Sequence, residues 1–280
     1  MKDIIVAIDF SKGSIHALEY ALELAGKLSS DVMLVWVDDQ PAPVFPAISD
    51  AAGKRDEAAK MLDELIATYK KDFKGGKLLA KTRKGKVYQE IAAQAKINGC
   101  SLIETGTHGV QGYEEYWVGS NANRIVTHAG CPVITVQNNY ALENNRTNCI
   151  VVPLDHSPST LHKIPFVVNF AVKTGAGICL LGINASPLKS IQRLINDAVI
   201  KAESYIKKNN VECMAEFIQT NDITTAIIEY TNKIDGGMIA LVSQANDPST
   251  HVILGQASQQ LINYSPVPVL CLHPIDNFKI

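Results

Sequence analysis

The chain has 280 residues, about twice the usual length of a single domain, so two domains are expected. Hydrophobic residues make up 46% of the chain and charged residues 19%, which suits a packed globular protein and excludes wholesale disorder. The formal charge of -2 provides no long-range field to attract nucleic acid or a membrane, and neither is expected as a partner. No apolar run reaches the roughly 18 residues of a membrane-spanning helix and no secretory signal follows Met1, so we expect a cytoplasmic protein.

Short runs rich in Val and Ile alternate with longer stretches of helical periodicity. In the first half, strands are predicted at 3–9, 31–38, 77–83, 101–106 and 131–136. Ser11 can cap the first helix between them and Gly26 can end it. In the second half, strands are predicted at 148–154, 177–183, 211–218, 237–243 and 267–272. Strict alternation of strand and helix predicts parallel sheets with helices on both faces.

The two halves resemble each other. Ile4–Ser11 and Ile150–Ser157 are both apolar runs that end in Asp-x-Ser. Near the other end of each half, Cys131–Val136 matches Val267–Leu272. Self-similarity of this kind indicates a tandem repeat. We therefore expect two homologous domains, over residues 1–140 and 148–280.

The cysteines are scattered and form no C-x-x-C pair. They are Cys100, Cys131, Cys149, Cys179, Cys213 and Cys271. This pattern is neither that of a disulfide framework nor that of a zinc site. Several lie inside apolar strand-like runs, where cysteine behaves as a small buried hydrophobe, and that role is predicted here.

The most informative motif follows the fourth predicted strand. Gly106-Thr107-His108-Gly109 is followed, after nine residues, by Gly119-Ser120-Asn121 at the start of a helix. Two glycines three residues apart let backbone amides approach a charged ligand, and a helix start adds free N–H groups and the positive end of the helix dipole. These parts suit phosphate. On spacing alone, an ordinary turn followed by a helix cap fits equally well.

The sequence resembles the universal stress protein family in its tandem two-domain form. The ATP-binding branch of that family carries G-x2-G-x9-G-[ST], which Gly106, Gly109, Gly119 and Ser120 match position for position. Asp9 at the end of the first strand and Cys131-Pro132-Val133 entering the last one match as well. The resemblance covers both halves.

The family fold implies two tandem doubly wound, Rossmann-like α/β domains, each with five parallel strands in the order 3-2-1-4-5. Strands 1 and 4 are then neighbours, and doubly wound sheets bind ligands in the crevice at such a point. The resemblance implies ATP, with Mg²⁺, as the ligand. Strand 1 and strand 2 would line the nucleoside, the loop after strand 4 the ribose and phosphate path, and the helix start at Gly119 the phosphates. The implied nucleotide-binding residues are Ala7, Asp9, Val37, Thr105, Gly106, His108, Gly109, Gly119, Ser120 and Asn121. An alternative role for Asp9 is to cap the helix that follows the first strand.

The second half departs from the motif. At the positions of Gly106 and Gly109 it has Val242 and Ala245, and Gln256 replaces the helix-start serine. These side chains occupy space where phosphate would approach and restrict the loop. We expect the fold to be kept and the nucleotide motif to be lost.

The expected function is that of a nucleotide-dependent stress-response or signalling module, with no catalytic residue and no metal site assigned. One alternative is a slow ATPase or nucleotide hydrolase that uses Asp9 and His108. Another is a scaffold whose second domain binds a different small ligand or a protein. By resemblance, the two domains pair through their last strands, 131–136 against 267–272, which protects two apolar edges and still allows a homodimer.

Overall fold

The computed structural model describes residues 3–39, 51–100, 102–107, 120–138, 140, 148–242 and 256–273. The chain divides into two compact units, Met1–Asn138 and Asn139–Ile280. Among the described residues, no helix combines the length and apolar character needed to cross a membrane.

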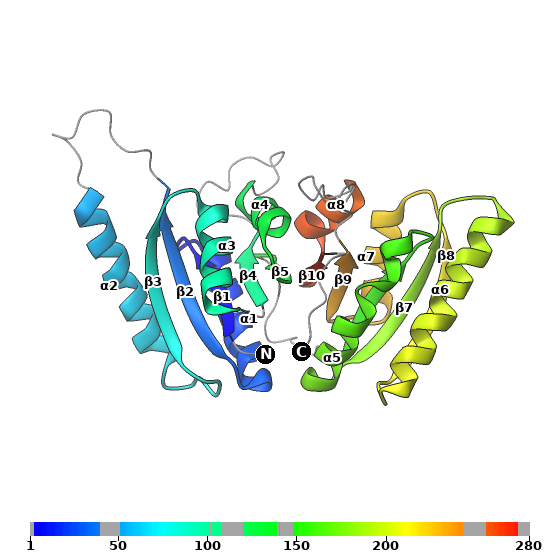
Figure 1. Cartoon of the computed structure of the whole chain (residues 1–280), viewed down its shortest axis with the longest axis horizontal. Helices are drawn as coiled ribbons and strands as arrows, with labels where there is room; N and C mark the ends of the chain where they lie inside the picture. Colours follow the sequence, from blue (N-terminus) through cyan, green and yellow to red (C-terminus); the bar gives the residue numbers. More distant parts are fainter. Residues whose placement is uncertain are drawn as a thin grey trace. The chain divides into compact units, whose positions relative to one another are not determined.

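The first unit is a parallel five-stranded sheet with helices on both faces (Figure 1). Its strands are β1 (Asp3–Ile8), β2 (Asp31–Asp38), β3 (Leu78–Lys84), β4 (Leu102–Gly106) and β5 (Val133–Val136). Its helices are α1 (Lys12–Leu28), α2 (Ala51–Tyr69), α3 (Val87–Asn98) and α4 (Ser120–His128). The strand order is β3-β2-β1-β4-β5, as predicted.

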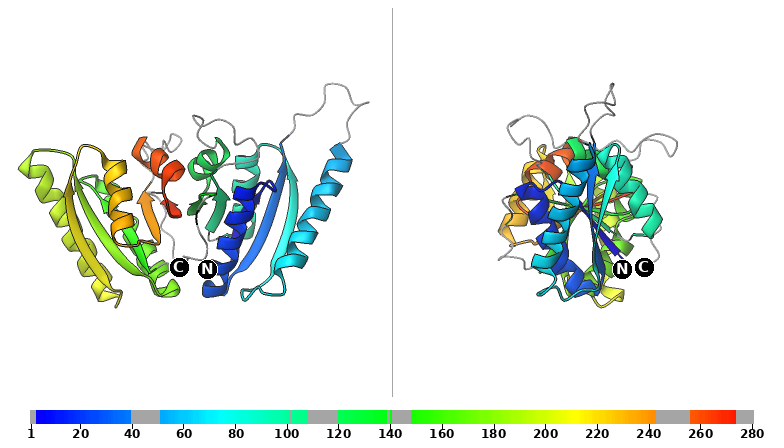
Figure 2. Two further views of the ribbon diagram at one scale, coloured as in Figure 1. Left: turned by 180° about the vertical axis from the view of Figure 1, so that it is seen from behind. Right: turned by 90° about the vertical axis from the view of Figure 1, so that its left-hand side faces the viewer.

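Both faces of this sheet are covered because the connections between parallel strands cross over it. Helices α1 and α2 lie on one face, and α3 and α4 pack together on the other (Figure 2, right). Ile4, Ile5 and Val6 in the central strand are therefore fully buried. A strand buried on both sides explains the continuous apolar run in the sequence.

Helix α1 begins as predicted and ends later. Ser11 is its N-cap, and the Ser11 side chain accepts a hydrogen bond from the backbone N–H of Ser14. The prediction that Gly26 ends the helix is wrong, because α1 continues to Leu28 and ends at Ser29, whose φ of 51° is left-handed. The extra turn buries Leu28 in the core.

The second unit repeats this architecture. Its strands are β6 (Cys149–Leu154), β7 (Gly177–Asn184), β8 (Cys213–Gln219), β9 (Met238–Val242) and β10 (Val269–Leu272). Its helices are α5 (Ile164–Thr174), α6 (Lys189–Lys208), α7 (Ile223–Lys233) and α8 (Gln256–Tyr264). A short 3-10 helix, η3 (Pro158–Leu161), precedes α5. The parallel order β8-β7-β6-β9-β10 is again 3-2-1-4-5 when the strands are counted within this unit. The predicted fold class is confirmed.

The same turn comes after the first strand of each unit. The Asp9 backbone N–H donates to the Ser14 hydroxyl (3.3 Å), and that of Asp155 donates to the Thr160 hydroxyl (3.1 Å). The turns therefore correspond at an offset of 146 residues, the offset of the two sequence runs. The helices after the two turns differ, since α1 starts directly after its cap, whereas η3 precedes α5.

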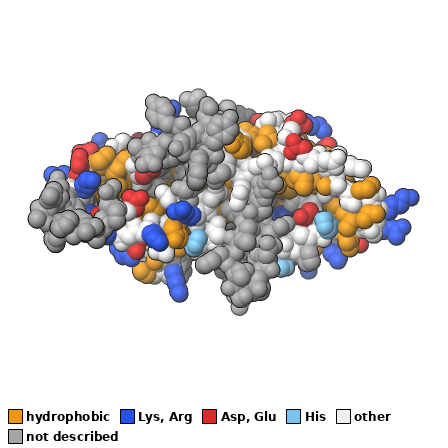
Figure 3. Space-filling view, turned by 90° about the horizontal axis from the view of Figure 1, so that it is seen from above, with side chains coloured by type: hydrophobic (Ala, Val, Ile, Leu, Met, Phe, Trp, Pro, Cys, Tyr) orange, Lys and Arg blue, Asp and Glu red, His pale blue; other side chains and the backbone are white. Residues whose placement is uncertain are grey.

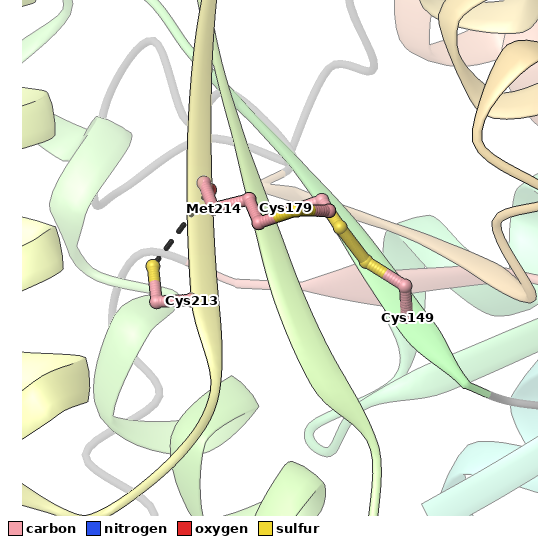
Figure 4. The surroundings of a disulfide bond; sticks show 4 residues. All are labelled: Cys149, Cys179, Cys213 and Met214. Atoms are coloured by element: carbon pink, nitrogen blue, oxygen red, sulfur yellow. Dashed lines mark hydrogen bonds between the residues drawn. A yellow bond between two sulfur atoms is a disulfide. The ribbon is translucent and has the colours of Figure 1, made fainter.

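The cysteine prediction is wrong for one pair. Cys149 on β6 and Cys179 on β7 form a disulfide, with Cα atoms 6.2 Å apart (Figure 4). The β6–β7 register pairs Cys149 with Gly177, so Cys179 lies two residues further along the neighbouring strand, on the same face. Strand register is a property of the folded sheet, so sequence spacing did not reveal the pair. The other four cysteines form no disulfide, and Cys100, Cys131 and Cys271 are buried as predicted.

The disulfide predicts how many thiols react. Labelling the unfolded, unreduced protein with a maleimide should modify four cysteines, and peptide mapping should recover a linked Cys149–Cys179 peptide. Because the bond closes a 30-residue separation, its reduction should lower the free energy of unfolding of the second unit by about 3 kcal/mol. Six labelled thiols in protein purified without reductant would contradict this pairing.

Candidate functional site: the crevice of the first unit

The candidate site lies at the carboxyl ends of β1 and β4. These strands are parallel neighbours, with Ile4 opposite Leu102 and Val6 opposite Glu104. Asp9 follows β1 directly, and Gly106 is the last residue of β4. The structure therefore brings together the two strand ends that the sequence pattern assigned to one crevice.

Asp9 presents an exposed carboxylate at this edge. Its Oδ1 accepts hydrogen bonds from the Ser11 backbone N–H (3.0 Å) and the Ser11 hydroxyl (2.5 Å). Ser11 in turn caps α1. Asp9 thus holds the turn in shape through Oδ1, while its other carboxylate oxygen has no hydrogen-bond partner among the described residues. The capping role belongs to Ser11.

Gly106 is required by a close approach of the backbone. A Cβ atom at this position would lie 2.6 Å from the backbone carbon and oxygen of Gly13, in the first turn of α1. Gly106 does not adopt the left-handed φ that would itself favour glycine. From the sequence, this glycine was attributed to phosphate approach or loop strain. The structure supplies a packing reason, which lets α1 lie against the end of β4.

The remaining described residues of the predicted site differ in exposure. Ala7 on β1, Val37 on β2 and Thr105 on β4 are buried, and the Thr105 hydroxyl donates to the carbonyl of Gly106 (3.2 Å). Asn121 is exposed in the first turn of α4, which begins at Ser120. His108, Gly109 and Gly119 lie outside the described residues.

Sequence patterns did not single out Glu104, which lies in the middle of β4 and is fully buried. Among the described residues, neither of its carboxylate oxygens has a hydrogen-bond partner. Burial raises the pKa of Glu104 well above its usual value, and the charge of Cys100 acts in the same direction. The protonated, neutral form of Glu104 therefore persists to a higher pH than that of an exposed glutamate. The available signal was a carboxylate directly after Leu102 and Ile103, inside a strand predicted to be buried on both faces.

Comparison with known proteins identifies the first unit. The sequence model of the universal stress protein family matches residues 1–137. A universal stress protein of Methanocaldococcus jannaschii is 29% identical over an alignment of 144 residues, which covers 49% of this chain and 82% of that protein. A Bacillus subtilis universal stress protein is 26% identical over 148 residues, covering 48% of this chain and 97% of the relative.

The first unit is a universal stress protein domain, and the chain is UspA-like. The alignment with a crystal structure of an Archaeoglobus fulgidus universal stress protein covers 97% of this chain and 98% of that protein, with a TM-score of 0.73 at 19% identity. The alignment with a Pseudomonas aeruginosa structure described as a putative universal stress protein covers 98% of this chain and 94% of that protein, with a TM-score of 0.66 at 16% identity. These structures share the fold, and coverage of both units fits the tandem form.

A first substitution tests the packing role of Gly106. Gly106→Ala should lower the free energy of unfolding of the first universal stress protein domain by about 1–3 kcal/mol, because the new methyl group overlaps the backbone of α1. The matched control is Gly130→Ala, where nothing lies within 4 Å of the added Cβ, and no loss is expected. Chemical denaturation measures both variants. Equal stability of the two variants would show that α1 does not approach β4 this closely.

A second substitution tests the buried acid of the same domain. The folded-state pKa of Glu104 is raised above its unfolded value, so its stability contribution is full below the unfolded pKa of about 4.3 and is lost as the pH rises through the folded pKa. Between those values the free energy of unfolding should fall by about 1.4 kcal/mol per pH unit. Glu104→Gln should remove this decline.

The control for that experiment is Glu64→Gln, a change at an exposed position of α2. Denaturation at a series of pH values above 4 should show the same slope for the control as for the unchanged protein. A pH dependence that survives in Glu104→Gln would assign it to another group.

Proposed function

We propose that the first domain binds ATP, together with Mg²⁺, in the crevice between β1 and β4 and acts as a nucleotide-dependent stress-response or signalling module. The observation that carries the proposal is the exposed Asp9 carboxylate beside the end of β4, where the G-x2-G-x9-G-S motif begins. Membership of the universal stress protein family supports it.

The elements around the crevice suit a nucleotide. Buried Ala7 and Val37 offer an apolar surface and backbone groups at the ends of β1 and β2. Helix α4 begins at Ser120, so its free N–H groups and the positive end of its dipole favour phosphate. The Asp9 carboxylate supplies the oxygen ligand that Mg²⁺ prefers in proteins. Pairing of the domains through their last strands stays a prediction of the family resemblance.

Isothermal titration with Mg-ATP tests this proposal. We expect about one ATP per chain, because the second unit has Val242 and Gln256 in place of a motif glycine and the serine. Gly109→Val should abolish binding and leave the fold intact. Ser120→Ala removes a hydrogen bond to a charged group and should weaken affinity by roughly ten- to a hundredfold.

The matched control for Ser120→Ala is Thr127→Ala. Thr127 lies toward the end of the same helix, where its hydroxyl donates to the carbonyl of Asn123 (2.7 Å). ATP affinity should be unchanged in this variant. Two ATP molecules per chain, or unchanged binding in Gly109→Val, would place the nucleotide elsewhere.

A further inference from the structure

The second unit contains a cavity of about 460 Å³ at the carboxyl ends of β6, β7 and β9. Sites for small molecules usually enclose about 300–1,000 Å³, so this cavity has the size of a ligand site. It lies where β6 and β9 are neighbours, the point at which the strand order changes direction. In Figure 3, which looks onto this end of the strands, hydrophobic side chains and histidines are exposed over the second unit, at the right.

Most of the cavity wall is apolar. Strand ends and helices on both faces of the sheet contribute branched aliphatic side chains to it. These include Leu154, Ile183, Ile191, Ile223, Ile227 and Val242. A polyphosphate chain gains nothing from such a wall, whereas the apolar body of a small molecule is stabilised by burial against it.

Two residue differences between the units make this cavity chemically different from the crevice of the first domain. Val242 ends β9 as Gly106 ends β4. At the 146-residue offset of the repeated turn, Lys163 replaces Ala17, which is fully buried in α1. The second unit therefore has an apolar side chain where the first has glycine, and a lysine where the first has a buried methyl group.

Lys163 is the unusual member of the wall. Its side chain lines the cavity and is only 4% exposed. Burial lowers the pKa of Lys163 to about 8, while the Asp155 carboxylate acts in the opposite direction, so the amine is mostly charged at neutral pH. Among the described residues, no carboxylate lies within 4.0 Å of the Lys163 Nζ atom. A buried ammonium beside an open cavity can be stabilised by an anion that enters the cavity.

The neighbouring carboxylate is already engaged. The Oδ1 atom of Asp155 accepts hydrogen bonds from the Ser157 backbone N–H (3.0 Å) and hydroxyl (2.6 Å). Burial raises the pKa of Asp155, but these hydrogen bonds and the charge of Lys163 outweigh it and hold the pKa below its usual value. Asp155 is therefore ionised and fixes the turn, as Asp9 does in the first domain.

We propose that the cavity of the second unit binds a small amphipathic carboxylate, with its carboxylate on the Lys163 amine and its apolar body against the aliphatic wall. The hydroxyl of Ser159 is a further polar group in the cavity wall. The proposal is independent of ATP binding in the first domain, because it involves different residues in a different unit.

The charge balance favours a carboxylate over a phosphate monoester. Lys163 supplies one positive charge, and the ionised Asp155 lies on the same cavity wall. A carboxylate places one negative charge beside Lys163, whereas a phosphate monoester brings a second one toward Asp155, and among the described residues no Lys or Arg other than Lys163 lines the cavity to offset it. The same balance disfavours the triphosphate of ATP.

Isothermal titration with decanoate, and with decanol as an uncharged probe of equal chain length, tests the site. Decanoate should bind about one molecule per chain, and more tightly than decanol. Lys163→Met keeps the apolar stem and removes the charge, so it should weaken decanoate binding by roughly tenfold or more and leave decanol binding unchanged. The matched control is Lys173→Met, at an exposed position of α5, which should bind both probes as the unchanged protein does.

A second variant keeps the proposal testable if Lys163→Met fails to fold. Ser258→Trp, at a partly exposed wall position of α8, fills the cavity and should abolish binding of both probes without lowering the thermal midpoint. Gly109→Val should leave decanoate binding intact even where ATP binding is lost, so the two proposals fail separately. Equal decanoate affinity in Lys163→Met, tighter binding of decyl phosphate, displacement of decanoate by ATP, or no decanoate binding would each overturn the proposal.

Discussion

The close approach between the end of β4 and the first turn of α1 underlies the arrangement of the first domain. A Cβ atom on Gly106 would lie 2.6 Å from the Gly13 backbone, so the two segments approach this closely because Gly106 carries no side chain. This contact brings the start of α1, with its Asp9–Ser11 turn, against the end of β4. Packing of the backbone and shaping of the crevice therefore depend on the same glycine.

The second unit differs from the first domain at the two positions that correspond to Gly106 and Gly13. Val242 ends β9, and at the offset of the repeated turn Ser159 stands where the first domain has Gly13. Both residues line the cavity of the second unit, and the turn continues as η3 before α5 begins at Ile164. The cavity beside Lys163 lies at this rebuilt turn. One fold thus carries two chemically different crevices, in line with the general separation of fold and function.

Buried ionisable groups show the same divergence. Glu104 is enclosed in the sheet of the first domain, where burial disfavours the ionised carboxylate and raises the pKa in favour of the neutral acid. Lys163 faces a cavity, so an anion can enter and compensate the charge that burial penalises. The surroundings of each group, rather than its residue type, decide whether burial has a functional consequence.

The sequence predicted the strands well because parallel strands buried on both faces are continuous apolar runs. The β2 prediction of 31–38 coincides with the observed strand, and β7 extends one residue beyond its predicted end. Asp9 and Gly106 were also placed correctly, because a parallel sheet brings the carboxyl ends of its strands to one edge. The Cys149–Cys179 bond and the packing of Gly106 against Gly13 depend on strand register and helix position. The role of Lys163 depends on enclosure by several elements, which local sequence patterns do not encode.

The decisive measurement is a crystal structure of the chain grown with a non-hydrolysable ATP analogue and Mg²⁺. We expect the polyphosphate in the first domain, between the Asp9 turn and the start of α4, and no nucleotide in the cavity beside Lys163. Nucleotide bound in the second cavity, or triphosphate remote from Asp9 in the first domain, would contradict the division of the two crevices between ATP and a carboxylate.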